Sequence, residues 1–165
     1  MAPTRRAVLR QGWKAGGVML GLAAGWTVFE SMRPLASGAT KGPITVGNVS
    51  SFPEGTATYV PAGRLFVANP GGEIFALSQK CPHLGCRVPF CESSGRFECG
   101  CHGSVFDLGG EWIAGPSPRG MDRYPVSADG DTLVVDTSTT IEGPPHGAKV
   151  YRTPPKGPSC SGKGD

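Results

Sequence analysis

The middle of the chain alternates short apolar stretches with turn residues, as in a protein built from β-strands. The short runs are rich in β-branched and aromatic side chains and are bounded by glycine, proline, asparagine or aspartate. No convincing helical period of apolar residues occurs between Ile44 and Asp136. The expected strands are Ile44–Val49, Thr56–Val60, Arg64–Asn69, Glu73–Ser78, Arg96–Cys99, Ser104–Asp107, Trp112–Ala114, Arg123–Ala128 and Thr132–Asp136. This pattern predicts a mainly β fold, a small antiparallel sandwich or barrel.

The N-terminus has a different pattern, in which a basic flank precedes an apolar segment. Arg5, Arg6, Arg10 and Lys14 occur before any acidic residue, and a Gly/Ala-rich apolar stretch runs from Ala15 to Phe29. The paired arginines and the apolar stretch together resemble a twin-arginine export signal. The alternative is the simple basic flank of a membrane helix.

The apolar segment is a candidate transmembrane helix. The run of 15 residues spans about 22 Å as a helix, less than the ~30 Å hydrocarbon core of a bilayer. Extension to Gly12–Met32 provides the missing length, with Lys14 and Glu30 near the ends. A weak cleavage site at Ala36–Ala39 is the alternative to a retained helix. We expect an uncleaved single-pass anchor with its basic end in the cytoplasm.

Composition divides the chain into four parts. Residues 1–35 are the signal and anchor, residues 36–43 a flexible hinge linker of small residues, residues 44–136 the β domain, and residues 137–165 a Pro/Gly-rich extended tail. With Gly 26 and Pro 16, the chain must contain many turns. The net charge of +3 is concentrated at the N-terminus, which excludes nucleic acid as a partner.

Two short loops carry the candidate chemistry. The first reads Cys81-Pro82-His83-Leu84-Gly85-Cys86, and the second reads Cys99-Gly100-Cys101-His102-Gly103-Ser104. Each loop offers a soft thiolate and an imidazole close together, which is typical of a metal site. The four candidate ligands are Cys81, His83, Cys99 and His102.

Zinc is one metal that two cysteines and two histidines could bind. Zinc sites, however, favour a gap of two to four residues within a ligand pair, whereas Cys81 and His83 are separated by one. Zinc also gives no reason for Cys86 and Cys101, which occupy matched places in the two loops. The zinc interpretation therefore leaves part of the pattern unexplained.

The pattern C-x-H-x-G-C followed by C-x-C-H-G-S resembles the Rieske iron–sulfur subunits of quinol–cytochrome c or plastocyanin oxidoreductases. The resemblance covers the domain from about Ile44 to Asp136. It implies a Rieske-type [2Fe–2S] cluster held by two loops, with cysteines on the inner iron and histidines on the outer, more exposed iron. Carried over by position, the inner ligands are Cys81 and Cys99, the outer ligands are His83 and His102, and Cys86–Cys101 is a disulfide between the loops.

Other segments refine the resemblance. The stretch Arg87–Phe90 and the short spacer before Cys99 look like the branch found in photosynthetic and some bacterial complexes. The segment Gly115–Pro118 resembles the "Pro loop" that covers a third side of the cluster; its alternative is an ordinary Pro/Gly turn. Rieske dioxygenases usually lack the two extra loop cysteines, and no catalytic mononuclear-iron domain fits in this chain.

One position departs from the pattern of high-potential members. Those proteins have a tyrosine two residues after the loop serine, where this chain has Phe106. Ser104 keeps its hydroxyl, which the resemblance places near a bridging sulfide. Hydrogen bonds to sulfur stabilise the reduced cluster, so we expect a reduction potential below that of members with both hydroxyls.

The resemblance implies a one-electron carrier that oxidises membrane quinol with coupled proton release. His102 is the candidate for the quinol contact, His83 is its exposed neighbour, and Leu84 is expected to pack against a cytochrome b-type subunit. The linker at Ser37–Pro43 would let the domain move between that subunit and a c-type cytochrome or equivalent acceptor. The chain would act as an enzyme only within such a complex, in the inner membrane and with its cluster domain on the periplasmic side.

A rival resemblance keeps the cluster and changes the complex. The Rieske small subunit of a periplasmic oxidoreductase such as arsenite oxidase has a similar signal and disulfide. Those subunits commonly lack the glycine after the second histidine and the Gly-Pro-x-Pro segment, both present here.

Three residues remain outside the Rieske pattern. Cys91 and Cys160 either form a second disulfide or remain two free or partner-facing thiols. His146, in the Pro-rich tail, has no partner motif and is interpreted as a solvated residue.

Overall fold

The computed structural model describes residues 4–33, 41–148, 151 and 154–160. They fall into two compact units, Met1–Ser37 and Gly38–Asp165, and each unit is described by itself. Most of the predicted hinge linker and the alternative cleavage site fall on residues 34–40, outside the described residues.

The N-terminal unit is one helix, α1 (Arg5–Met32), as the sequence predicts. Thr4 caps its start, because its side-chain oxygen accepts from the Ala7 amide at 3.4 Å. The expected membrane-spanning character is not found: no helix within the described residues is both long and apolar enough to cross a bilayer. The reason is composition: α1 contains five glycines and the charged residues Lys14 and Glu30, which make the helix less hydrophobic.

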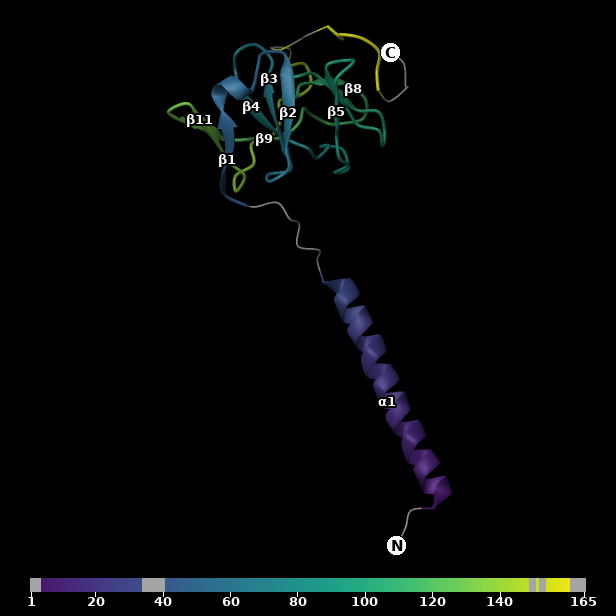
Figure 1. Cartoon of the computed structure of the whole chain (residues 1–165). Coiled ribbons are helices and arrows are strands. Elements are labelled where there is room, and N and C mark those ends of the chain that lie inside the picture. Colours follow the sequence, from purple (N-terminus) through teal and green to yellow (C-terminus); the bar gives the residue numbers. More distant parts are fainter. Residues whose placement is uncertain (1–3, 34–40, 149–150, 152–153, 161–165) are drawn as a thin grey trace. The chain divides into compact units, whose positions relative to one another are not determined.

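The second unit is an antiparallel β domain, which confirms the predicted fold class (Figure 1). The strands are β1 (Pro43–Asn48), β2 (Thr56–Val60), β3 (Leu65–Asn69), β4 (Phe75–Ser78), β5 (Phe90–Cys91), β6 (Arg96–Glu98), β7 (Val105–Phe106), β8 (Trp112–Ala114), β9 (Arg123–Tyr124), β10 (Val126–Asp129) and β11 (Thr132–Asp136). A 3-10 turn, η1 (Val49–Ser51), follows the first strand. One sheet has the strand order β1-β11-β10, the second, middle sheet β2-β3-β4-β9, and the third β5-β6-β7-β8.

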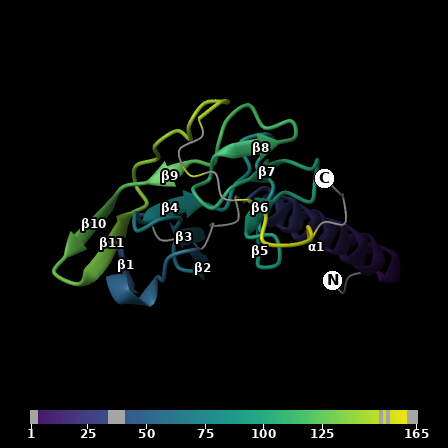
Figure 2. The same cartoon turned by 90° about the horizontal axis from the view of Figure 1, so that it is seen from above.

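Proline divides one expected strand into two that belong to different sheets. The stretch 123–128 was predicted as a single strand, but Pro125 has no amide hydrogen to donate to a ladder. Before it, β9 pairs with β4; after it, β10 pairs with β11. The chain thereby passes from the middle sheet to the β1-β11-β10 sheet, which lies on the opposite side of the domain from β5 and β8 in both views (Figures 1 and 2).

Two hydrophobic clusters form the core of the domain. The smaller one lies between β3, β4 and β11 and includes Leu65 and Val135. The larger one joins the middle sheet to the β5-β8 sheet through edge-on or tilted aromatic contacts, with Phe97 5.1 Å from the rings of both Phe66 and Phe90. Burial of such rings is worth about 2 kcal/mol each. Cys81 belongs to this larger cluster, so the core of the domain and the candidate metal loops are continuous.

The described residues after Asp136 lie on the domain and are bonded to it. Ile141 forms a β-bridge with Arg123, and the Gly120 amide donates to the Pro144 carbonyl at 2.8 Å. The backbone at Gly143 lies so close to that at Gly120 that a Cβ on Gly143 would overlap the Gly120 carbonyl oxygen. This segment thus contributes to the surface that borders the Pro loop.

Candidate metal centre

The first loop connects β4 to β5 and closes on itself through backbone hydrogen bonds. The Cys81 amide donates to the Cys86 carbonyl at 2.8 Å, and the Gly85 amide donates back to the Cys81 carbonyl at 2.9 Å. Gly85 has a φ of 79°, in the region that favours glycine. The turn holds Cys81 at the base of the loop and places His83 near its tip.

The second loop connects β6 to β7 and repeats this arrangement. The Cys99 amide donates to the Ser104 carbonyl at 2.8 Å, and the Gly103 amide donates to the Cys99 carbonyl at 3.0 Å. Gly103 has a φ of 80°, matching its counterpart in the first loop. The two loops therefore present a cysteine from the same position of the same kind of turn.

The two base cysteines face each other inside the domain. Cys81 and Cys99 are each 3% exposed, and they are the free cysteines of the described chain. Burial is the main cause that raises the pKa of the Cys81 thiol, and the hydrogen-bonded Cys99 thiol raises it further. A metal would have to displace these protons, since thiolate is the form that binds.

The two histidines lie on the outer side of the cysteines. Their rings are 4.9 Å apart at the centroids and perpendicular; His83 is half-buried and His102 is exposed. Leu84, next to the first histidine, is 70% exposed. Two buried thiols with two adjacent outer imidazoles form a donor set that fits a cluster with sulfur ligands on one iron and nitrogen ligands on the other.

A disulfide joins the loops beside this donor set. The structure pairs Cys86 with Cys101, with 6.7 Å between their Cα atoms. Their sulfur atoms lie within 4.8 Å of Cys99 Sγ. The cross-link therefore fixes the spacing of the loops at the level of the candidate ligands.

The Pro loop, Gly115–Pro118, packs directly on the second loop. A Cβ on Gly115 would lie 2.5 Å from the Gly103 carbonyl oxygen and from Ser104 Cα, and its φ is 88°. The Ser117 amide donates to Ser104 Oγ at 3.1 Å, in a buried position. The nearby Ser104 hydroxyl acts to lower the pKa of the Cys81 thiol, against the larger effect of burial. Ser104 thus links the Pro loop to a candidate ligand.

His146 has partners that the sequence interpretation missed. Its ring stacks on Trp112 with centroids 4.0 Å apart, and its Nε2 lies 2.6 Å from the Ser117 carbonyl oxygen. His146 is exposed, as expected of a solvated residue, but the sequence interpretation did not foresee these two contacts. No local pattern signals a contact between residues 29 apart in a segment without regular structure.

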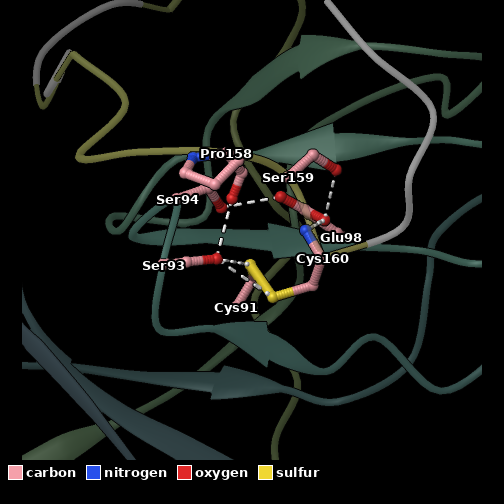
Figure 3. Close-up of a disulfide and its surroundings, with 7 residues drawn as sticks. All are labelled: Cys91, Ser93, Ser94, Glu98, Pro158, Ser159 and Cys160. Atoms are coloured by element: carbon pink, nitrogen blue, oxygen red, sulfur yellow. Dashed lines mark hydrogen bonds between the residues drawn. A yellow bond between two sulfur atoms is a disulfide. The ribbon is translucent and has the colours of Figure 1, made fainter.

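A second disulfide joins Cys91 to Cys160, which settles the alternative left open by the sequence (Figure 3). Cys91, at the end of β5, is buried. Ser93 hydroxyl donates to the Pro158 carbonyl at 2.7 Å, beside the cross-link. The far part of the chain is thus fastened to the β5–β6 hairpin.

A buried carboxylate lies beside this disulfide. Glu98 is 4% exposed, at the end of β6 (Figure 3). It accepts from the Ser94 hydroxyl at 2.6 Å, from the Ser159 hydroxyl at 2.8 Å and from the Cys160 amide at 2.9 Å. Several donors of this kind compensate for the cost of burying a charge.

Known proteins resemble the chain across the β domain. The profile of the Rieske [2Fe-2S] domain matches residues 42–125, about half of the chain. The cytochrome b6-f complex iron-sulfur subunit of Prochlorococcus marinus subsp. pastoris is 33% identical over 138 residues, 73% of this chain and 76% of the relative. The subunit of the same name from Chlorobaculum thiosulfatiphilum is 34% identical over 94 residues, 56% of this chain and 52% of the relative.

Among solved structures, the plasma membrane Rieske protein of Synechocystis PCC 6803 is 30% identical, with a TM-score of 0.45, over 56% of this chain and 97% of that chain. A chain of a hyperthermophilic respiratory complex III is 28% identical, with a TM-score of 0.46, over 75% of this chain and 98% of that chain. The chain spans about half the length of the first curated relatives that it matches, 52% in each case. The family profile, together with the Prochlorococcus relative, shows that this chain belongs to the Rieske [2Fe–2S] family and that its cofactor is a [2Fe–2S] cluster.

Proposed function

We propose that this chain is the electron-transfer subunit of a cytochrome bc-type complex, which takes electrons from a membrane quinol and passes them to a c-type cytochrome or an equivalent acceptor. The observation that carries the proposal is the layering of the site. Two thiols are buried inside the domain, and two neighbouring imidazoles are more exposed. The names of the curated relatives, subunits of cytochrome b6-f complexes, support the same kind of complex.

The cysteines and histidines would divide the work of holding the cluster. Cys81 and Cys99 would bind it from the core side as thiolates, where the hydrophobic cluster excludes water. His83 and His102 would bind it from the outer side, each through one ring nitrogen. The bound cluster supplies reversible one-electron transfer.

The exposed histidine has the position needed for proton transfer. His102 is the more exposed of the two imidazoles, so its ring nitrogen not bound to iron would face a quinol. In the imidazolate form, in which that nitrogen carries no hydrogen, it would accept a hydrogen bond from a quinol hydroxyl and then take up its proton. Leu84, exposed beside the other histidine, provides an apolar contact for the quinol pocket of a cytochrome b-type subunit. The rest of the tip is made of the two loops, so docking there would bring the partner to the cluster.

The location of the complex follows from the same proposal. The paired Arg5 and Arg6, the first two residues of α1, would direct export of the folded, cofactor-loaded chain. Export to an oxidising compartment agrees with two disulfides in the domain. The chain would associate with the inner membrane as part of its complex, with the cluster domain on the periplasmic side.

The decisive experiment is purification of the complex from membranes through a tag on this chain. We expect iron and acid-labile sulfide, a reduced-state EPR signal with a low average g-value, and a co-purifying di-haem cytochrome b. A co-purifying molybdenum subunit would instead identify the small subunit of a periplasmic oxidoreductase and overturn the proposed complex.

The histidine assignment has an internal control, because the chain has 3 histidines. His83→Ala and His102→Ala should each abolish the EPR signal. His146→Gln should keep the full iron content. Loss of iron in all three variants, or in none, would contradict the proposed ligand set.

A further inference from the structure

Two stacked aromatic side chains hold the Pro loop from outside. Trp112 Nε1–H donates to the Gly115 carbonyl at 3.0 Å, and His146 Nε2 lies 2.6 Å from the Ser117 carbonyl oxygen. A carbonyl oxygen only accepts, so His146 Nε2 must carry the hydrogen. Both the neutral Nε2–H tautomer and the imidazolium can make this bond. The stack with Trp112, 23° from parallel, fixes the orientation of the imidazole.

The Pro loop, held in this way, contacts the second cluster loop. Gly115 lies against the backbone of the second loop, and Ser117 donates its amide to Ser104 Oγ, a hydroxyl close to the Cys81 thiol. His146 is thus connected through Ser117 to Ser104, a residue of the second cluster loop. Displacement of the Pro loop would break this connection and open one side of the site to water.

His146 itself rests on a part of the tail that is fastened independently. Pro145, its neighbour, forms a β-bridge with Arg119, and the Gly120 amide donates to the Pro144 carbonyl. The Gly143 amide donates to Asp122 Oδ1 at 3.1 Å. The imidazole is therefore presented to the Pro loop by a fixed backbone.

We propose that His146, seated on Trp112, is a positioning residue that keeps the Pro loop closed over the cluster. The proposal rests on the proposed function only in that the two loops must hold the cluster. It does not depend on the quinol or on the complex. His146 would make opening of the Pro loop rarer and loss of the cluster slower.

The test measures cluster loss in the full-length, cluster-loaded chain. Iron removal by an excess of a strong chelator is followed by the decay of visible absorbance, at a temperature well below unfolding. His146→Ala should speed iron loss about fivefold, the size expected for one lost hydrogen bond. His146→Gln, whose amide can occupy the place of Nε2 and donate to the Ser117 carbonyl, should restore the rate to within about twofold of wild type. Trp112→Phe, which keeps a ring but loses the donor to Gly115, should also speed iron loss.

The matched control removes a tail bond of the same kind elsewhere. Lys156 Nζ donates to the Gly55 carbonyl at 2.8 Å, far along the chain from the Pro loop contacts. Lys156→Met should leave the rate of iron loss unchanged. Amide hydrogen exchange gives a second readout, in which His146→Ala should weaken protection of Ser117.

The outcomes separate clearly. Equal rates of iron loss in wild type and His146→Ala, or equal acceleration in His146→Ala and Lys156→Met, would overturn the proposal. If the alanine variant yields no loaded protein, His146→Gln and Trp112→Phe decide: unchanged rates in the tryptophan variant would count against a role for the stacked pair. A failure of the proposed quinol complex would leave all these rates unaffected.

Discussion

The amide of Cys160 donates to the carboxylate of Glu98 at 2.9 Å, and Glu98 directly precedes Cys99 in the chain. The last described part of the tail is therefore bonded to the strand that enters the second cluster loop. The Cys91–Cys160 disulfide makes the same connection covalent, on the neighbouring strand of the hairpin. The tail thus stabilises the sheet that carries one half of the metal centre.

Removal of the second disulfide should destabilise the domain. Its cysteines are 69 residues apart, and closure of a loop of that length is worth roughly 4 kcal/mol in the chain-entropy account. Cys91→Ala combined with Cys160→Ala should lower the free energy of unfolding in urea by up to that amount. The cluster's EPR signal should persist, because the first disulfide and all four candidate ligands are kept. A change of less than about 1 kcal/mol would show that the hydrogen bonds of Glu98 hold the tail alone.

Gly115→Ala should lower the free energy of unfolding far more than Gly130→Ala, although both glycines have a positive φ. The new methyl group would overlap the backbone of Gly103 and Ser104, so we expect a loss of more than about 3 kcal/mol and partial loss of the cluster. Gly130, in the turn between β10 and β11, has a φ of 59°, and a Cβ added to it would have no other heavy atom within 4 Å. Gly130→Ala should therefore cost only the backbone strain, about 1 kcal/mol. Chemical denaturation of both variants measures the difference.

The buried Asp107 should make the domain more stable in mild acid. Burial, aided by the nearby Glu111 carboxylate, raises the pKa of Asp107 to about 6 from 3.8. The folded state then binds more protons than the unfolded state between these values, so the free energy of unfolding rises as pH falls from about 7 to about 4. Asp107→Asn should flatten this slope and stabilise the protein at pH 7 by on the order of 2 kcal/mol.

The control for the pH dependence of stability is Asp136, an exposed carboxylate whose pKa is lowered, whereas that of Asp107 is raised. Bonds from Ser138 lower the pKa of Asp136, so its contribution is lost only in stronger acid. Asp136→Asn should leave the slope between pH 4 and pH 7 unchanged. An Asp107→Asn variant with the wild-type slope would assign the effect to another group.

Hydroxyl groups near the ligand sulfurs should set the reduction potential of the cluster. Ser104 is 1% exposed and its hydroxyl lies near the Cys81 thiol, so Ser104→Ala should lower the midpoint potential by about 50–100 mV, the equivalent of one hydrogen bond to a charged sulfur. Phe106→Tyr should raise the potential, since the phenol adds a donor that this chain lacks. Ser138→Ala, on the exposed surface, should have no effect. Redox titrations that show no upward shift in Phe106→Tyr would exclude that tyrosine position as a donor.

Much of the fold could be predicted from residue pattern, because most strands alternate clearly and end at turn residues. The stretches Thr56–Val60, Trp112–Ala114 and Thr132–Asp136 coincide with observed strands. The strand Phe90–Cys91 escaped prediction because two residues have no period to detect. The division at Pro125 depends on which sheet each half joins, which local sequence does not reveal.

The candidate site was predictable where the chemistry is local and was missed where it is not. The two cysteine–histidine loops are short motifs, and the structure pairs His83 with His102 and Cys81 with Cys99. The contact of His146 with Ser117 instead joins distant residues through a tail segment without regular structure. Its position results from the packing of Gly143 and Pro144 on the domain, which only the tertiary structure specifies.

Each of the two metal-binding loops is closed by hydrogen bonds within its own six residues, from Cys81 to Cys86 and from Cys99 to Ser104. The backbone of each loop is thus held by hydrogen bonds of its own. Binding of the cluster would then require only that the ligand side chains adopt their bound rotamers and that two thiols lose their protons. Little conformational entropy would be lost in that step. A scaffold of this kind can fold first and bind its iron–sulfur cluster afterwards.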